Sequence, residues 1–318
     1  MTVALLLAMK PSPPPSGVFP PGWPDPARLA RDLPGDAPRL LADLVCDHWE
    51  RYRSRLRACR GSVDGEEVHD FRVEARRLLA LIELLGGLVP ARAARGLHRR
   101  VKQHLDLFDE LRDAQVQWPE AVRLGRSHPA AREFGAYLGR RLERSRRAAS
   151  RAMRGVRTRR AGKWLDRCAA AARRRRRQGA GGGGREQVAK AFRRSCAAFA
   201  RRRSEVRAAV PETVHRARVA LKRVRYMAEA LSALGAPPET SCLEALRRWQ
   251  AAMGAVQDAE LLRREFGHFL RQGRVAAGAG ARLASLLGRR LREKSRRCLG
   301  ELEGADPAAG RGCRGGQR

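Results

Sequence analysis

Apolar residues recur every three or four positions along most of the chain, from about residue 37 to about residue 302. This spacing is typical of amphipathic helices, and runs of β-branched residues that would indicate strands are absent. Proline and glycine fall mostly at the breaks between the periodic segments, where they are expected to end helices. The pattern therefore predicts an all-α protein, with helices near residues 37–59, 65–86, 92–125, 129–153, 159–177, 185–207, 211–234, 239–272 and 276–301.

One segment of the chain occurs twice. Residues 68–77 (VHDFRVEARR) are matched by residues 214–223 (VHRARVALKR) at an offset of 146 residues. A second pair, residues 111–115 (LRDAQ) and 256–260 (VQDAE), follows at an offset of 145 residues. Two matching blocks at nearly the same offset predict a duplicated structural unit.

On a helical projection, each copy of the repeat has an apolar face and a basic face. The apolar stripe has the 4-3-4-3 spacing of helices that pack in bundles, and it consists of Phe71, Ala75, Leu78, Ile82 and Leu85 in one copy and Ala217, Leu221, Val224, Ala228 and Leu231 in the other. The basic face carries His69, Arg72, Arg76 and Glu83, or His215, Arg218, Lys222 and Glu229, with Arg77 and Arg223 beside it. Each copy therefore predicts an edge with one imidazole and two cations.

Changes in composition divide the chain into segments. Residues 1–36 are rich in proline and predict a disordered or extended leader. A run of five arginines, residues 173–177, is followed by a glycine-rich segment, 178–184, that predicts a flexible linker. We therefore expect one helical domain over residues 37–302, with a first half (37–177) and a second half (185–302), and a flexible tail over 303–318.

The chain is strongly basic, with a formal net charge of +34 from 67 basic and 33 acidic residues. Self-repulsion at such a charge favours a polyanionic partner, such as nucleic acid, an anionic membrane surface or polyphosphate. A general bias toward arginine would explain the total charge, but it does not explain the repeated placement of the cations.

The seven cysteines are irregularly spaced without a C-x-x-C pair, which predicts a reducing cytoplasm without disulfides or zinc. No apolar run is long enough to predict a transmembrane helix.

The repeated basic edge allows three interpretations: a solvated polar face, a metal site or a phosphate site. A solvated face needs only polar residues, whereas here the same residue types occur at equivalent positions in both copies of the repeat. Glu66-x-x-His69 and Glu212-x-x-His215 have the i, i+3 spacing of di-iron bundles, but the cations that follow on this face are unfavourable beside a metal. Arginine binds phosphate through two oxygens at once, and a helix N-terminus also favours an anion. Phosphate binding is therefore the favoured interpretation, and no nucleophile paired with a base predicts catalysis.

At these residues the sequence resembles the CHAD family, the conserved histidine α-helical domain. The resemblance rests on the pattern Val-His-x-x-Arg-Val-x-x-Arg/Lys-Arg in both halves, and on Arg112-Asp113 and Gln257-Asp258. It covers roughly residues 37–302. It implies two pseudo-symmetric helical bundles, as duplicated four-helix units, around a central basic groove or pore. It also implies binding of inorganic polyphosphate, and several family members are found at polyphosphate granules.

Carried over position by position, the resemblance implies a polyphosphate site without cofactor or metal, formed by His69, Arg72, Arg76, Arg77, Lys102, Arg112, His215, Arg218, Lys222, Arg223, Arg225 and Arg247. Asp113 and Asp258 are expected to orient neighbouring basic side chains. Leu79 stands where many members have a further arginine, as Arg225 does here, so the first half is expected to bind less tightly. Gln257 also departs from the more usual asparagine or arginine. The alternating Glu-x-Glu-x-Lys motif of the CYTH domains fused to many relatives is absent.

We therefore expect a non-enzymatic, cytoplasmic protein that binds inorganic polyphosphate and is targeted to polyphosphate granules. Nucleic-acid binding is the alternative that the charge supports, but aromatic residues make up only 5% of the chain and base stacking needs aromatics on the basic face. A scaffold whose charge is incidental is a third interpretation. A membrane is not an expected partner. The oligomeric state stays open, and so does the question whether the histidines contact the ligand or orient their neighbours.

Overall fold

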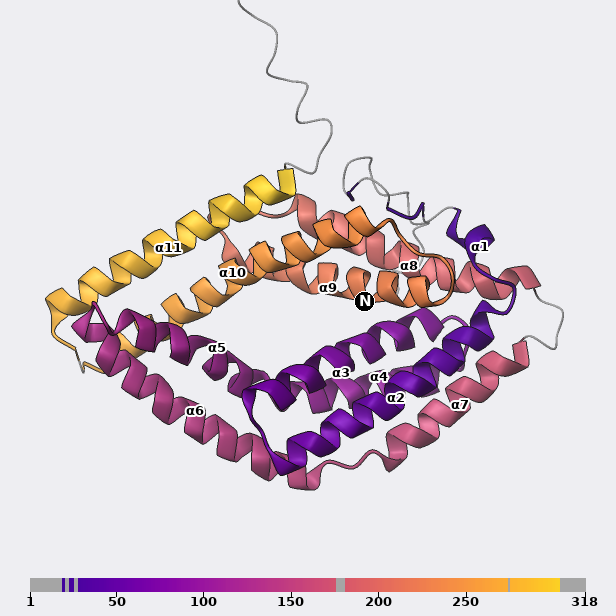
Figure 1. Cartoon of the computed structure of the whole chain (residues 1–318), viewed down its shortest axis with the longest axis horizontal. Helices are drawn as coiled ribbons and strands as arrows, with labels where there is room; N and C mark the ends of the chain where they lie inside the picture. Colours follow the sequence, from indigo (N-terminus) through magenta and orange to yellow (C-terminus); the bar gives the residue numbers. More distant parts are fainter. Residues whose placement is uncertain (1–18, 21–22, 26–27, 176–180, 274, 304–318) are drawn as a thin grey trace, which may run out of the picture.

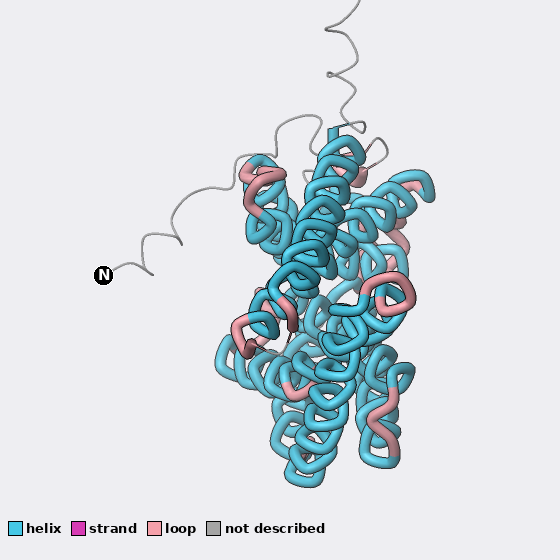
Figure 2. Tube along the Cα trace, turned by 90° about the vertical axis from the view of Figure 1, so that its left-hand side faces the viewer, coloured by secondary structure: helices cyan, strands magenta, loops and turns pink. Residues whose placement is uncertain are grey.

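The computed structural model describes residues 19–20, 23–25, 28–175, 181–273 and 275–303. In these residues the chain consists of helices joined by short turns, with no strand beyond an isolated bridge between Arg207 and Val210 (Figure 2). The helices are α1 (Leu29–Asp32), α2 (Ala37–Gly61), α3 (Gly65–Leu85), α4 (Ala91–Asp106), α5 (Asp109–Leu124), α6 (Pro129–Gly155), α7 (Arg159–Arg175), α8 (Gly181–Ser204), α9 (Pro211–Ala233), α10 (Thr240–Leu270) and α11 (Ala277–Glu303). The predicted all-α fold is confirmed. None of these helices is both long and apolar enough to cross a membrane.

The two halves of the chain face each other across the molecule. In the first half, α2, α3, α4 and α7 pack together, and α5 and α6 form a helical hairpin that extends away from them (Figure 1). In the second half, α8, α9, α10 and α11 each pack on the next helix along the chain. Contacts between the halves join α3 to α9, α5 to α10 and α6 to α11, which places the two copies of the repeat opposite one another.

The apolar side chains form two separate cores. The larger core contains residues of both halves, from α1–α4, the start of α5, the end of α6, α7–α9, the first part of α10 and the last part of α11. The smaller core joins the hairpin of α5 and α6 to the end of α10 and the start of α11. Both predicted apolar stripes lie in the larger core, where every member is at most 2% exposed. Because each core contains helices of both halves, the cores hold the halves against each other at both ends of the molecule.

The prediction of a single helix over residues 92–125 is wrong, because the chain breaks between α4 and α5. The break falls at Leu107 and Phe108, and no proline or glycine marks it in the sequence. Phe108 is fully buried and its ring packs on that of Phe71, with the centroids 5.2 Å apart. This long-range contact fixes the break, and it places Asp109 at the start of α5, next to α3.

The prediction of a disordered leader over residues 1–36 is wrong for the described part of that segment. Phe19 stacks on Trp23, with ring centroids 4.6 Å apart, and Leu29 and Leu33 are each 1% exposed. These side chains pack against the larger core, where the rings of Phe19 and Trp23 meet Phe199 and Phe192 of α8. The apolar surface that they bury offsets the entropy lost on ordering the segment. Residues 1–18 lie outside the described residues.

The predicted linker over residues 178–184 is wrong for its last four residues, because α8 begins at Gly181. A side chain at Gly184 would place its Cβ 2.7 Å from Cγ of Pro38. Glycine is therefore required at this position for the close approach of α8 to the start of α2, rather than for flexibility. The rest of the predicted linker that precedes Gly181, the last two arginines of the run, and the tail from residue 304 lie outside the described residues.

Candidate anion-binding site

Direct packing of α3 on α9 brings the two copies of the repeat together. Two ion pairs join these helices: Arg223 pairs with Glu83, and Nε of Arg77 lies 3.7 Å from Oε2 of Glu229. The repeat offset of 146 residues relates Arg77 to Arg223 and Glu83 to Glu229, so the two pairs are equivalent under exchange of the halves. This reciprocity is what a pseudo-twofold relation between α3 and α9 requires. Arg77 and Arg223, both predicted site residues, thus hold the two halves together.

Four cations meet where α3 faces α9: Arg72 and Arg76 from the first copy, and Arg218 and Lys222 from the second. Burial, together with the charges of Arg72 and Arg218, lowers the pKa of Arg76 to about 10. Burial lowers the pKa of Lys222 to about 6, together with the charges of Arg218, Arg76 and Arg72. Like charges and loss of solvent both disfavour a cation. These four side chains, which we call the basic cluster, are therefore close enough to repel one another.

The two equivalent arginines of the basic cluster have different surroundings. Nη1 of Arg72 donates to Oδ1 of Asp109 at 2.7 Å and to the carbonyl of Leu105 at 3.3 Å. Nε of Arg218 is buried and has no hydrogen-bond partner in the described part of the chain. The guanidinium of Arg218 lies against Gly254, where a Cβ would be 3.1 Å from its Nη2. Gly254 follows Asp109 by 145 residues, the offset of the second repeat block. The second half thus has a glycine where the first half has the neutralising aspartate.

Further charges surround the basic cluster on α5, α10 and α11. Arg112 on α5 has a pKa lowered by burial and by the nearby charge of Arg72. Asp258 on α10 lies within electrostatic reach of Arg218, Lys294, Arg112 and Lys222. The orienting role expected for Asp258 stays a prediction, because its interactions with these cations are electrostatic, without an ion pair or hydrogen bond among the described residues. Asp109, Asp113 and Asp258 are fewer than the cations around them, so the region has an excess of positive charge.

The remaining predicted site residues do not join the basic cluster. Nδ1 of His215 hydrogen-bonds the side chain of Gln257 on α10, which is an orienting contact, whereas His69 is exposed and has no partner among the described residues. Lys102 pairs with Asp106 on its own helix, and Arg247 is exposed on α10.

Arg225 is also held by neighbouring side chains. Its Nε donates to Oε1 of Gln250 at 2.9 Å, it pairs with Glu229, and its guanidinium lies 4.3 Å above the ring of Tyr226. Arg225 is therefore engaged within the protein rather than presented to a ligand.

Three residues that shape the site were missed by sequence reasoning. Asp109 and Gly254 occupy equivalent positions, so extending the second repeat block by two residues would have shown the exchange of aspartate for glycine. Lys294 lies on α11, outside both repeat blocks, and no sequence signal connects it with the cluster. Only the packing of α11 on α10 brings it near Asp258.

The chemistry available at the basic cluster is that of anion binding. Guanidinium groups bind phosphate oxygens in pairs, and an ammonium group acts as a point charge. No group of three or more His, Cys, Asp or Glu side chains in the described part of the chain is arranged to hold a metal ion. The arrangement suits an anion with several negative charges, which would supply the counter-charge that the cluster lacks.

The sequence model of the CHAD domain family matches residues 41–267, which is more than half of the chain. This protein belongs to the CHAD domain family. No protein with a curated description matches it. Two solved structures share the fold of this CHAD domain at 18% sequence identity. The CHAD domain of the plant Ricinus communis superposes with a TM-score of 0.62, covering 83% of this chain and 91% of that one. PptA from Streptomyces chartreusis superposes with a TM-score of 0.65, covering 86% of this chain and 99% of that one.

Proposed function

We propose that this CHAD domain binds inorganic polyphosphate at the basic cluster and does not catalyse a reaction. The observation that carries the proposal is the buried Nε of Arg218, which has no acceptor among the described residues and lies among three other cations, with Asp258 as the nearby negative charge. A buried, unpaired charged group is costly unless something compensates it. A chain of phosphates offers both the hydrogen-bond acceptors and the negative charge that are needed.

The surroundings of the cluster favour a phosphate polymer over a nucleic acid. Tyr226, the aromatic residue on α9 nearest the cations, is 5% exposed and is covered by Arg225. Single-stranded nucleic acids gain much of their affinity from bases stacked on exposed aromatic rings. Polyphosphate has no bases, so a basic site without such a ring is sufficient for it. Members of the family that the chain resembles bind polyphosphate, which supports the same choice.

We also propose a cytoplasmic location, with recruitment to polyphosphate granules through the same site. The support for the cytoplasm is the irregular set of cysteines, of which the six in the described residues are free thiols. Recruitment to granules needs no separate signal if the basic cluster binds the polymer directly. In this proposal the protein acts as a binding module.

The direct test compares three polyanions at matched phosphate concentration and near-physiological salt: long-chain polyphosphate, single-stranded DNA and duplex DNA. We expect polyphosphate to bind at least ~10-fold more tightly than either DNA, because the site has cations but no stacking platform. Equal affinity for the three polymers would contradict the proposal and favour general electrostatic attraction. Tighter binding of single-stranded DNA would favour the nucleic-acid alternative.

A charge-matched pair of triple variants tests the location of the site. The site variant is Arg76→Ala/Arg218→Ala/Lys222→Ala. The control variant removes two arginines and one lysine that are exposed and have no ion pair among the described residues, Arg144→Ala/Arg151→Ala/Lys163→Ala. Because each phosphate contact releases counterions, the slope of log K against log salt should become shallower by about 2 in the site variant alone. An equal change in both variants would assign binding to the overall charge.

A further inference from the structure

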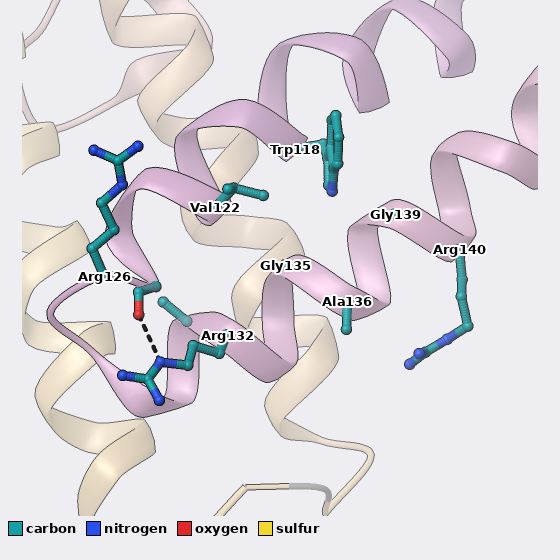
Figure 3. Close-up of a pocket in the computed structure, with 10 residues that line it drawn as sticks. Trp118, Val122, Arg126, Arg132, Gly135, Ala136, Gly139 and Arg140 are labelled. Carbon is teal, nitrogen blue, oxygen red and sulfur yellow. Dashed lines mark hydrogen bonds between the residues drawn. The ribbon is translucent and has the colours of Figure 1, made fainter.

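A groove on the outer side of the α5–α6 hairpin is independent of the basic cluster. It encloses about 680 Å³, a volume within the range of about 300–1,000 Å³ that is typical of ligand sites. Its walls come from both helices of the hairpin and from the turn between them (Figure 3). The residues that line it are Trp118, Val122, Gly125, Arg126, Ala131, Arg132, Gly135, Ala136, Gly139 and Arg140.

The groove exposes large apolar side chains that the fold does not cover. Trp118 is 39% exposed and Val122 is 46% exposed, and they are two of only five large apolar side chains that are exposed in the described part of the chain. Trp118 lies close to Gly139, where a Cβ would be 3.3 Å from its Nε1. The small residues of α6 form a floor beneath Trp118 and Val122. An exposed tryptophan beside such a floor is typical of a surface that binds another protein.

The charges at the groove are all positive. Arg126 and Arg132 lie toward one end and Arg140 lies toward the other (Figure 3), and no acidic residue lines the groove. Arg132 donates through Nε to the carbonyl of Gly125 at 2.9 Å, whereas the side chains of Arg126 and Arg140 are exposed and have no hydrogen bond or ion pair among the described residues. An acidic partner would therefore find cations at both ends of an apolar centre.

The groove and the basic cluster share no residue, because the cluster lies on α3 and α9 and the groove on α5 and α6. On α5, at 100° per residue, Trp118 and Val122 lie about 140° and about 180° from Asp113, and about 120° and about 80° from Arg112. The smaller core holds the hairpin against α10 and α11, so the groove is built on a packed scaffold. A partner in the groove and an anion at the cluster would not compete for space.

From these observations we infer that the α5–α6 groove docks an acidic, amphipathic segment of another protein, whose apolar side chains contact Trp118 and Val122 while its carboxylates face the arginines. A second copy of this chain is disfavoured as the occupant, because the same face of two copies would bring the unpaired arginines together. Docking in the groove does not require polyphosphate binding at the basic cluster. With both sites occupied, the protein would link an acidic partner to a polyanion.

The test uses the full-length protein and a short fluorescein-labelled peptide that is rich in Asp and Glu and carries Leu and Phe one helical turn apart. Fluorescence anisotropy at near-physiological salt should show saturable binding of this peptide. A peptide with Leu and Phe replaced by Ser should bind at least ~10-fold more weakly, because the apolar anchors supply much of the binding energy. Failure of the first peptide to bind, or equal binding of both peptides, would overturn the inference.

Two variants locate the peptide. Ala136→Trp fills the groove from the exposed side of α6, and Trp118→Ala removes its wall; each should weaken binding by ~10-fold or more. The control Arg144→Ala/Arg151→Ala removes exposed arginines farther along α6 and should leave affinity unchanged within about twofold. Circular dichroism and thermal melting verify that the variants fold. Unchanged binding by both groove variants, or displacement of the peptide by long-chain polyphosphate, would contradict a separate docking site.

Discussion

The two copies of the repeat present the same arginine in two different states. Arg72 in the first copy is neutralised by Asp109 and also bonds the carbonyl of Leu105. Arg218 in the second copy faces Gly254 and has no acceptor for its Nε. A single exchange of aspartate for glycine thus separates a structural ion pair from an unpaired cation. A repeated motif can therefore keep its residue types while one of two equivalent arginines is paired within the protein and the other is not.

An unpaired cation in a partly buried position is costly to the free protein. Strongly perturbed charges therefore tend to mark functional sites, where a ligand supplies the compensation. In this protein Arg72 already has a counter-ion, so we assign to it the smaller part in binding. The second half should contribute the greater part of the affinity for polyphosphate.

The largest expected effect is the difference between Arg218→Ala and Arg72→Ala. Loss of a charge-assisted contact is worth about 1.5–3 kcal/mol, so Arg218→Ala should weaken polyphosphate binding by ~10-fold or more, as measured by isothermal titration calorimetry. Its free energy of unfolding should be unchanged or higher, because an unpaired cation has been removed. Arg72→Ala should weaken binding by ~3-fold at most and lower the free energy of unfolding by about 1–2 kcal/mol. Equal losses of affinity would show that the two copies bind alike.

A second prediction concerns pH. The pKa of Lys222 is lowered to about 6 in the free protein, and a bound polyanion should raise it because the anion favours the charged amine. Binding then takes up a proton above pH 6, and the affinity should fall as the pH rises from about 6 toward the raised pKa, by at most tenfold per pH unit. In Lys222→Arg the side chain stays charged over this range, so the part of the pH dependence of the affinity that is due to residue 222 should be absent. Identical pH profiles for the wild type and Lys222→Arg would place the polymer away from Lys222.

The same pKa has a consequence for stability. The usual pKa of a lysine is 10.5, and that of Lys222 in the folded protein is about 6, so the unfolded chain binds more protons between these two pH values. Stability should therefore rise with pH through this window, and the contribution of Lys222 should be least favourable at pH 6 and below. Urea unfolding of the wild type and of Lys222→Met across pH 6–9 measures this contribution. If the free energy of unfolding of the wild type changes with pH in parallel with that of Lys222→Met, the expected contribution of Lys222 is contradicted.

The smallest expected effects concern the reciprocal ion pairs, where the two copies behave alike. Glu83→Gln and Glu229→Gln should each lower the free energy of unfolding by about 1 kcal/mol, because each weakens one of the equivalent links between α3 and α9. Polyphosphate affinity should change by less than about twofold. The control Glu143→Gln removes an exposed pair within α6 and should cost at most ~0.5 kcal/mol. A loss of binding in either variant would give these pairs a part in the site.

Much of the fold could be predicted from the sequence, because the helical periodicity is strong. The stripe from Phe71 to Leu85 is buried as predicted, and α9 begins at the predicted Pro211. The break at Phe108 could not be predicted, because it depends on packing against Phe71, which is distant in sequence. The helical start of α8 could not be predicted either, because the sequence does not distinguish a glycine that permits close helix packing from a glycine in a flexible linker.

The sequence could also identify the cations of the basic cluster, because the repeat places them at equivalent helical positions. The sequence could not show which of these cations form ion pairs within the protein and which do not. Arg77 and Arg223 looked equivalent to the cluster residues, yet the pairing of α3 with α9 directs them to Glu229 and Glu83. Partners of this kind come from other helices, and a single sequence does not show which helices meet.

The measurement that tests the central claim most directly is polyphosphate binding by Gly254→Asp and Gly254→Asn. Aspartate at this position recreates the neutralised state of the first copy, whereas asparagine adds a side chain of similar shape without charge. Because the obstructing atom is the end of the Arg218 side chain, either residue can be accommodated by its movement. We expect Gly254→Asp to bind ~10-fold more weakly than Gly254→Asn in calorimetry at near-physiological salt. Equal affinity of the two variants would contradict the claim that the unpaired Arg218 binds the polymer.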